Sequence, residues 1–266
     1  MNTNDIREYF LSHSPRVDPS QTVDTVKAGD PTRPVSSVAV GWFASLDDIK
    51  AAVGLGCDLF ITHEPTFWDH APAESRWRSV EPAITKQKLL DDSGIVVLRC
   101  HDCWDNWPGI GIRDSWAAWL GLGDPIAESE DKWHATYAIE PAPLREFAAD
   151  VAARIEPLGE DSVSVMGDPN RVVSRPAVGV GCGGPDKDMI DEGADVLIVC
   201  YDGAGYWSAR ERLFELGAAV ITVEHGTSEM PGLMNLANHL SETFPELTVH
   251  YLDKHPRPWT VRPKAG

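Results

Sequence analysis

The sequence is poor in basic residues: 23 Lys and Arg stand against 41 Asp and Glu, giving a net charge of −18. Such a chain repels nucleic-acid phosphates and anionic lipid headgroups, so we expect no nucleic-acid partner and no membrane partner. Cysteine is also scarce, and the odd count of 5 has no disulfide-like spacing, which is typical of a reducing compartment. We therefore expect a cytoplasmic protein that binds a small molecule or another protein.

Long apolar runs are missing as well. No run approaches the ~20 residues of a membrane helix, and residues 1–10 lack the basic and apolar regions of a secretory signal. The chain contains no G-x-S-x-G elbow and no Walker loop. His63-Glu64 does not begin a zincin motif, because Phe67 stands where the second histidine is required and Pro65 opposes a helix.

Short apolar segments alternate with helical patterns along the chain. Strands are predicted at residues 37–40, 58–62, 94–98, 133–140 (isolated), 162–166, 174–180, 196–199, 220–223 and 247–252. Helices are predicted at residues 4–11 (with Asn4 as cap), 46–53, 82–90, 112–120, 143–155, 186–192, 209–216 and 233–243. Residues 14–34 are predicted to be a loop, and Pro231-Gly232 is predicted to break the chain before the last helix. This alternation indicates an α/β fold with largely parallel sheets.

An internal repeat organises these elements. Residues 38–41 (VAVG) are echoed by residues 178–181 (VGVG), and residues 56–61 (GCDLFI) by residues 193–198 (GADVLI). In both halves a glycine and an apolar strand then lead to H-x-x-x-D/E, followed by Pro-Gly and an aliphatic residue. The repeat predicts two similar α/β lobes related by internal duplication, residues 1–128 and 129–266, with a metal site in the cleft between them.

The predicted metal site lies at strand ends, where ligands collect in parallel α/β sheets. Apolar strands lead directly to His63-Glu64, to the pair His101 and Asp105, and to the pair His225 and Glu229. The predicted metal ligands are His63, Glu64, Asp105, His225 and Glu229. Two imidazoles and three carboxylates suit one or two divalent ions, Mn, Fe or Zn rather than copper. We expect His101 or Glu64 to act in catalysis by carrying the proton.

At these residues the chain resembles the NIF three-like family, whose members are often labelled GTP cyclohydrolase 1 type 2 homologues. The matching motifs are Thr62-His63-Glu64-Pro65, His101 with Asp105, and His225 with Glu229, within a likeness that covers residues 38–240. The resemblance implies two similar α/β lobes, a dinuclear metal centre between them and a ring-shaped homohexamer. It also implies that four of these residues are ligands of two divalent ions per chain, with His101 close by: His63, Asp105, His225 and Glu229.

Two residues depart from the family pattern. Glu64 replaces a histidine, and Glu224 replaces the glycine before the late histidine. As a carboxylate, Glu64 can ligate and favour harder ions, or it can act as a general base beside a single stronger metal site. Both roles stay open from the sequence.

These patterns predict a metal-dependent hydrolase for an amide-like or ring C–N bond in a small, planar, weakly charged substrate. Weak charge is expected because the basic residues near the motifs are mainly Arg99 and Arg113, and because the turn at residues 181–184 is the one candidate anion cradle. The alternatives are GTP cyclohydrolase-like ring opening and a non-catalytic metal-binding scaffold or regulatory protein. The tryptophans expected to favour a planar ring are Trp68, Trp104, Trp107 and Trp207.

Overall fold

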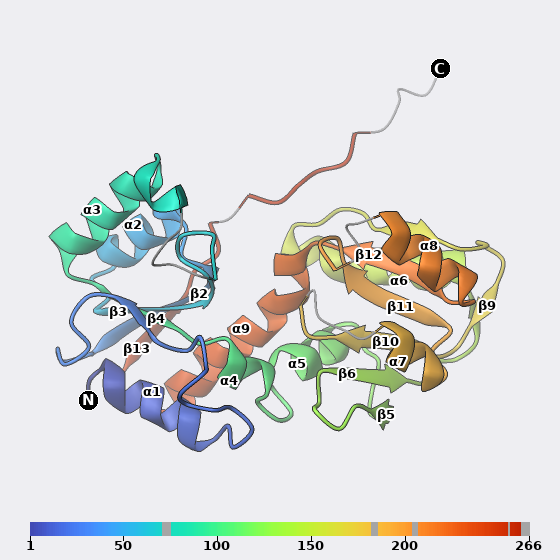
Figure 1. The fold of residues 1–266 in the computed structure, drawn as a ribbon, viewed down its shortest axis with the longest axis horizontal. Coiled ribbons are helices and arrows are strands. Elements are labelled where there is room, and N and C mark those ends of the chain that lie inside the picture. Colours follow the sequence, from blue (N-terminus) through green and yellow to red (C-terminus); the bar gives the residue numbers. More distant parts are fainter. Residues whose placement is uncertain (71–75, 182–185, 204–206, 255, 262–266) are drawn as a thin grey trace. The chain divides into compact units, whose positions relative to one another are not determined.

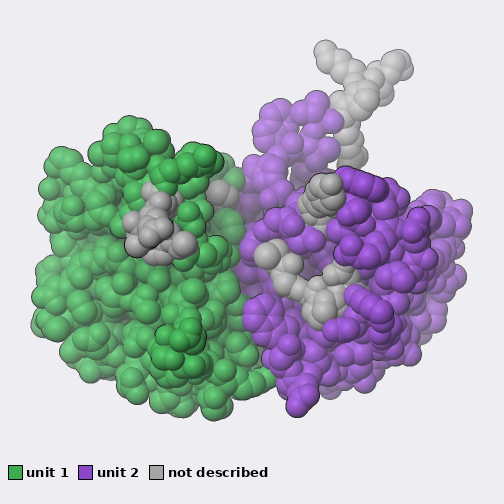
Figure 2. Space-filling view, viewed as in Figure 1, with its two compact units in different colours: residues 1–111, 232–256 green, residues 112–231, 257–266 purple. Residues whose placement is uncertain are grey.

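The computed structural model describes residues 1–70, 76–181, 186–203, 207–254 and 256–261 (Figure 1). The chain forms two compact units, Met1–Gly111 with Gly232–Pro256, and Ile112–Pro231 with Arg257–Gly266 (Figure 2). This division differs from the predicted boundary at residues 128/129: the first segment of the first unit ends at Gly111, and the C-terminal strand returns to the sheet of that unit. Among the described residues, no helix combines the length and the apolar character needed to cross a bilayer.

The first unit is built on a five-stranded sheet. Its strands, in spatial order, are β1 (Val26–Ala28), β4 (Val96–Arg99), β3 (Leu59–Glu64), β2 (Ser37–Phe43) and β13 (Thr248–Tyr251). All neighbours pair in parallel except β1, which pairs antiparallel with β4. The loop predicted over residues 14–34 therefore contains an edge strand, whose three residues are too few for a periodic pattern.

The helices of the first unit cover both faces of this sheet. They are α1 (Thr3–Ser12), α2 (Leu46–Gly54), the 3-10 turn η1 (Arg76–Ser79), α3 (Ala83–Ser93), α4 (Asp102–Asp105) and the later part of α9 (His225–Thr243). Helices α2 and α3 lie on one face and α1 on the other (Figure 1). The cap of α1 is Asn2 and not Asn4, because the Asn2 Oδ1 accepts the backbone N–H of Asn4 at 2.9 Å and the Asp5 carboxylate accepts the Asn2 N–H at 2.8 Å.

A lysine is buried in this unit between α3 and the loop that follows β3. Lys86 is 1% exposed, and its Nζ donates to the Thr66 carbonyl at 2.6 Å. The ammonium also lies over the rings of Phe43 and Trp68, at 4.5 and 5.0 Å from their centroids. Lys86 thereby holds the loop that continues from His63 and Glu64.

This burial predicts a pH dependence of stability. Burial lowers the pKa of Lys86 to about 8, with Asp48 opposing the shift, whereas an unfolded lysine titrates near ~10.4. Between these values the unfolded chain binds more protons, so the free energy of unfolding rises with pH. We expect Lys86→Met to remove about 2 kcal/mol of this rise, measured by urea unfolding at pH 7.5 and 10.5. Equal pH slopes for the two proteins would contradict the assignment.

The second unit has a mixed sheet of six strands. In spatial order they are β5 (Pro125–Glu128), β6 (His134–Tyr137), β10 (Pro176–Gly179), β11 (Val196–Cys200), β12 (Ala219–Val223) and β8 (Ser164–Met166). Only the pairs β10–β11 and β11–β12 are parallel. The prediction of largely parallel sheets thus holds for the first sheet, whereas the second is antiparallel at both sides. Strand β6, predicted to be isolated, pairs with both β5 and β10.

The parallel strands of the two sheets follow the sequence repeat. Strands β2, β3 and β4 are adjacent and parallel in the first unit, and β10, β11 and β12 are adjacent and parallel in the second. This correspondence is consistent with an internal duplication. The remaining elements of the second unit are α5 (Ile112–Trp119), β7 (Ala142–Pro143) paired with β9 (Val172–Val173), α6 (Leu144–Ile155), η2 (Glu156–Leu158), α7 (Asp186–Asp191), α8 (Trp207–Glu215) and the start of α9.

Helix α9 begins earlier than predicted. It runs from His225 to Thr243 with Pro231 inside it, so the predicted break at Pro231-Gly232 is wrong. A proline removes one intrahelical hydrogen bond, and here the surrounding residues 226–233 are all buried. Burial of this helical segment outweighs the lost bond. His225 and Glu229 consequently occupy successive turns of one helix.

Candidate metal centre

Strand β3 delivers the first two candidate ligands. Its apolar residues are buried, and it ends at His63, which is 1% exposed, and Glu64, which is partly exposed. The Nδ1 of His63 lies 3.1 Å from the Cys100 carbonyl. A carbonyl only accepts hydrogen bonds, so Nδ1 carries the proton and Nε2 keeps the lone pair that a metal requires.

Helix α4 positions the next two side chains. The buried Asp24 carboxylate accepts the backbone N–H groups of His101, Asp102 and Cys103 at 2.7, 3.0 and 2.8 Å. These bonds satisfy the N-terminus of α4 and fix where it begins. Because Asp105 follows His101 by four residues, the two side chains lie on the same face of the helix.

The four side chains converge within the first unit. The His63 and His101 rings stack at 4.5 Å between centroids. Asp105 reaches both imidazoles, at 3.5 Å from the His63 Nε2 and 3.2 Å from the His101 Nδ1. One ligand atom each from His63, Glu64 and His101 lies within 4.8 Å of the others. We name His63, Glu64, His101 and Asp105 the first cluster.

Two polar neighbours orient the first cluster. The His101 Nδ1 donates to the Asp102 carboxylate at 2.9 Å, and Thr22 donates to the same carboxylate at 2.7 Å. Burial opposes ionisation, but these hydrogen bonds outweigh it and hold the pKa of Asp102 well below its usual range.

The second neighbour of the first cluster is Arg99. Its guanidinium, 1% exposed, lies 3.5 Å from Glu64 and donates to the His63 carbonyl at 2.8 Å. Arg99 thereby offsets part of the negative charge that Glu64 adds.

A second cluster lies in the second unit, where β12 leads into α9. The His225 Nε2 lies 3.0 Å from the Glu229 carboxylate, and its Nδ1 lies 2.7 Å from the Asp202 carboxylate. Burial by itself lowers the pKa of His225, but Glu229 and Asp202 outweigh it and raise that pKa to about 12. The two carboxylates thus strongly favour a positive charge at this point. We name Asp202, His225 and Glu229 the second cluster.

Gly181 leaves room beside the second cluster. A Cβ at this position would lie 2.2 Å from the Glu229 Oε1 and 2.7 Å from the His225 Nε2, and φ is +44°. Only glycine fits this close approach without displacing the carboxylate or the imidazole. The candidate anion cradle at residues 181–184 is not supported at Gly181, which faces a carboxylate, and residues 182–184 lie outside the described residues.

The predicted ligand set therefore divides between the units. His63, Glu64 and Asp105 belong to the first cluster, together with His101. His225 and Glu229 belong to the second cluster with Asp202. Asp24 and Asp202 were not predicted; the only sequence signal for Asp202 is its place just after β11. In both clusters, imidazole and carboxylate donors match the ligand preferences of first-row divalent ions.

The tryptophans and Arg113 do not all lie where the sequence suggested. Trp104 and Trp107 are 0% and 8% exposed and pack against Phe10 in the core. Arg113 is buried and paired with Asp114 and Glu128. These three side chains therefore stabilise the fold and are not available to a substrate.

Comparison with known proteins identifies the family. The model of Duf34/NIF3 (NGG1p interacting factor 3) matches residues 1–258. The chain belongs to the Duf34/NIF3 family. A relative of this Duf34/NIF3 protein is the GTP cyclohydrolase 1 type 2 homolog of Chlamydia pneumoniae, 25% identical over 83% of this chain and 85% of the relative. A homolog of the same name from Neisseria meningitidis is 25% identical over 84% of this chain and 86% of its own.

Solved structures show the same fold. The Bacillus cereus protein related to NIF3 has a TM-score of 0.82 at 14% identity, covering 98% of this chain and 99% of its own. A structural-genomics protein named ybgI has a TM-score of 0.79 at 24% identity, covering 97% and 100%. The α/β fold expected from the resemblance is thus confirmed over nearly the whole Duf34/NIF3 chain.

Proposed function

We propose that this Duf34/NIF3 protein is a metal-dependent hydrolase that acts on an amide-like or ring C–N bond of a small, planar substrate. The observation that carries the proposal is the convergence of imidazoles and carboxylates in two clusters, one of which is built directly on the end of β3. The proposed ligands of two divalent ions, Mn, Fe or Zn, are His63, Glu64, Asp105, His225 and Glu229.

The donor chemistry supports hard or borderline ions. Carboxylate oxygens outnumber imidazole nitrogens among the proposed ligands, and Arg99 tempers the added charge of Glu64. The thiol of Cys100 is close in sequence but is buried, and burial raises its pKa well above the usual value. A neutral thiol is a poor ligand, so we expect no thiolate coordination.

A bound divalent ion supplies Lewis acidity and makes a water molecule more acidic. The protein's own contribution is to orient the ligands and to move the proton. His101 and Glu64 are better exposed to a substrate than His63, with side chains 19%, 13% and 0% exposed. His101, held between the Asp102 and Asp105 carboxylates, is the proposed proton carrier, with Glu64 as the alternative.

We further propose that the five ligands hold the two ions in one two-metal centre. Titration with Mn²⁺, followed by electron paramagnetic resonance, is expected to show two equivalents bound per chain with spin coupling between them. A single uncoupled equivalent would support the alternative in which Glu64 is a base beside one ion.

The homohexamer implied by the family resemblance also stays a prediction, and light scattering checks it.

A second candidate is GTP cyclohydrolase-like ring opening, which the names of the Chlamydia pneumoniae and Neisseria meningitidis relatives favour. In the sequence, few basic residues lie near the motifs, which favoured a weakly charged substrate. Lys27 and Arg78, distant in sequence, line a pocket together with Arg99. We therefore keep the planar ring in the proposal and withdraw the expectation of weak charge.

The decisive assay compares metal-loaded protein with chelated protein on a panel of lactams, cyclic imides and GTP. We expect turnover of a cyclic amide that requires metal and is lost in His101→Gln while metal content is retained. Metal-dependent ring opening of GTP alone would favour the second candidate. Bound metal without turnover of any compound would indicate a scaffold or regulatory protein and contradict the hydrolase proposal.

A further inference from the structure

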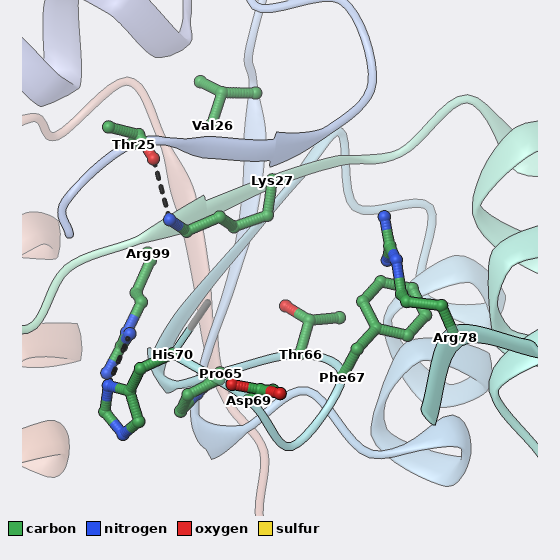
Figure 3. Close-up of a pocket in the computed structure, with 10 residues that line it drawn as sticks. All are labelled: Thr25, Val26, Lys27, Pro65, Thr66, Phe67, Asp69, His70, Arg78 and Arg99. Carbon is green, nitrogen blue, oxygen red and sulfur yellow. Dashed lines mark hydrogen bonds between the residues drawn. The ribbon is translucent and has the colours of Figure 1, made fainter. Parts of the chain in front are cut away.

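The first unit contains a pocket of about 300 Å³ next to the first cluster (Figure 3). Its walls come from β1, the loop after β3, η1 and β4. The volume is at the lower end of the range for small-molecule sites, ~300–1,000 Å³. Among the described residues, three basic side chains, Lys27, Arg78 and Arg99, line it against one carboxylate, Asp69. This concentration of positive charge is unusual in a chain whose net charge is −18.

The basic groups of the pocket make few hydrogen bonds to the described part of the protein. Among the described residues, Lys27 has one side-chain hydrogen bond, to the Thr25 hydroxyl at 2.7 Å, and no salt bridge. The Arg78 guanidinium lies 3.8 Å above the Phe67 ring, and its Nη1 is buried without a hydrogen-bond partner in the described part of the chain. A buried donor without an acceptor destabilises the protein unless a ligand satisfies it.

Thr66 adds an uncharged donor to the same wall. It is 3% exposed, and its buried hydroxyl finds no hydrogen-bond partner among the residues that the structure describes. Figure 3 shows this hydroxyl on the side of Thr66 that faces Lys27. A hydroxyl next to basic groups is a common arrangement around a bound phosphate or carboxylate.

Electrostatics within the pocket also favour an anion. Burial, and then the charge of Arg99, lower the pKa of Lys27, and Asp24 and Asp102 offset only part of that effect. Negative charge placed between Lys27 and Arg99 would relieve both the desolvation and the repulsion. Among the described residues, the Arg78 guanidinium contacts the Phe67 ring and no carboxylate, so its charge also remains available to a ligand.

We propose that this pocket binds an oxyanion group of the substrate, phosphoryl or carboxylate, through Lys27, Arg78 and the Thr66 hydroxyl. The assignment of that group to the substrate rests on the proposed function. It follows from the position of Arg99, which lines the pocket and also contacts the first cluster. Arg99 donates to the His63 carbonyl at 2.8 Å, and its Nη1 lies 3.3 Å from the His70 Nδ1 (Figure 3). The substrate is accordingly a small anion, recognised beside the bond that is cleaved.

The test measures anion binding directly, with inorganic phosphate and acetate as probes. Binding is followed at low ionic strength by broadening of the phosphate phosphorus signal and of the acetate methyl signal, with and without chelator. We expect Lys27→Gln and Arg78→Gln each to weaken binding about tenfold, the loss of one charge-assisted contact. Lys50→Gln is the matched control, because Lys50 is exposed and pairs with Asp47 at 3.1 Å.

The outcomes separate the pocket from the metal sites. Phosphate binding identifies a phosphoryl group, and binding of acetate alone identifies a carboxylate. Retention of binding in His225→Ala and in chelated protein assigns it to the pocket even if no hydrolase activity is found. Absence of binding by both probes, or equal affinity in Lys27→Gln, Arg78→Gln and the native protein, would overturn the proposal.

Discussion

Gly181→Ala is expected to abolish metal binding at the second cluster and to lower the free energy of unfolding by about 2 kcal/mol. The added Cβ would lie 2.2 Å from the Glu229 Oε1, closer than any real contact, so the carboxylate or the backbone must move. The backbone at φ +44° further disfavours alanine, by roughly 1–2 kcal/mol. Metal content by mass spectrometry and unfolding in urea measure the two effects.

Gly217→Ala provides the matched control. Gly217 also has a positive φ, of +92°, but a Cβ there meets nothing within 4 Å. We expect this variant to lose stability through backbone strain while keeping its full metal content. If both variants retained metal equally, the close approach of Gly181 to the second cluster would have no part in metal binding.

His225→Ala is expected to reduce metal affinity at the second cluster at least 100-fold. The variant removes the only imidazole of that cluster and leaves the Glu229 carboxylate, 2% exposed, without its contact at 3.0 Å. Loss of one partner from a buried pair costs roughly 3–5 kcal/mol. The second cluster is open to solvent at Asp202, so solvent screens part of this loss, and we expect the free energy of unfolding to fall by about 2 kcal/mol. Competition with a fluorescent chelator gives the affinity, and urea unfolding gives the stability.

His239→Ala controls for removal of an imidazole from the same helix. His239 lies in α9 but contacts Tyr9, at 2.8 Å, and the ring of Trp107. We expect this variant to lose stability and to keep its metal. Equal metal content in His225→Ala, His239→Ala and native protein would show that the second cluster is not a metal site.

Much of the first and second clusters was predictable because each depends on local patterns. An apolar run that ends abruptly, as at His63 or His225, places polar side chains at a strand end. The spacing of His225 and Glu229 then brings the two side chains together once that segment is helical. The error at Pro231 did not affect this convergence, because burial and not proline decided where α9 begins.

The residues that were missed act over long sequence separations. Asp24 fixes the start of α4 across 77 residues, from a segment without periodicity. Lys27 lies in an edge strand of three residues, and Arg78 in a short 3-10 turn, so neither had a pattern to identify it. The return of residues 232–256 to the first unit was missed for the same reason, since only the pairing of β13 with β2 shows that the C-terminal strand belongs to the first sheet.

Diffraction from crystals of the protein as purified, collected at the absorption edges of Mn, Fe and Zn, shows whether both clusters hold metal. We expect anomalous peaks about 2.0–2.2 Å from the His63 Nε2 and from the His225 Nε2, with carboxylate oxygens of Glu64 or Asp105 and of Glu229 at similar distances. Well-diffracting crystals that show no anomalous peak at either cluster, even after soaking in these ions, would contradict metal binding by these residues.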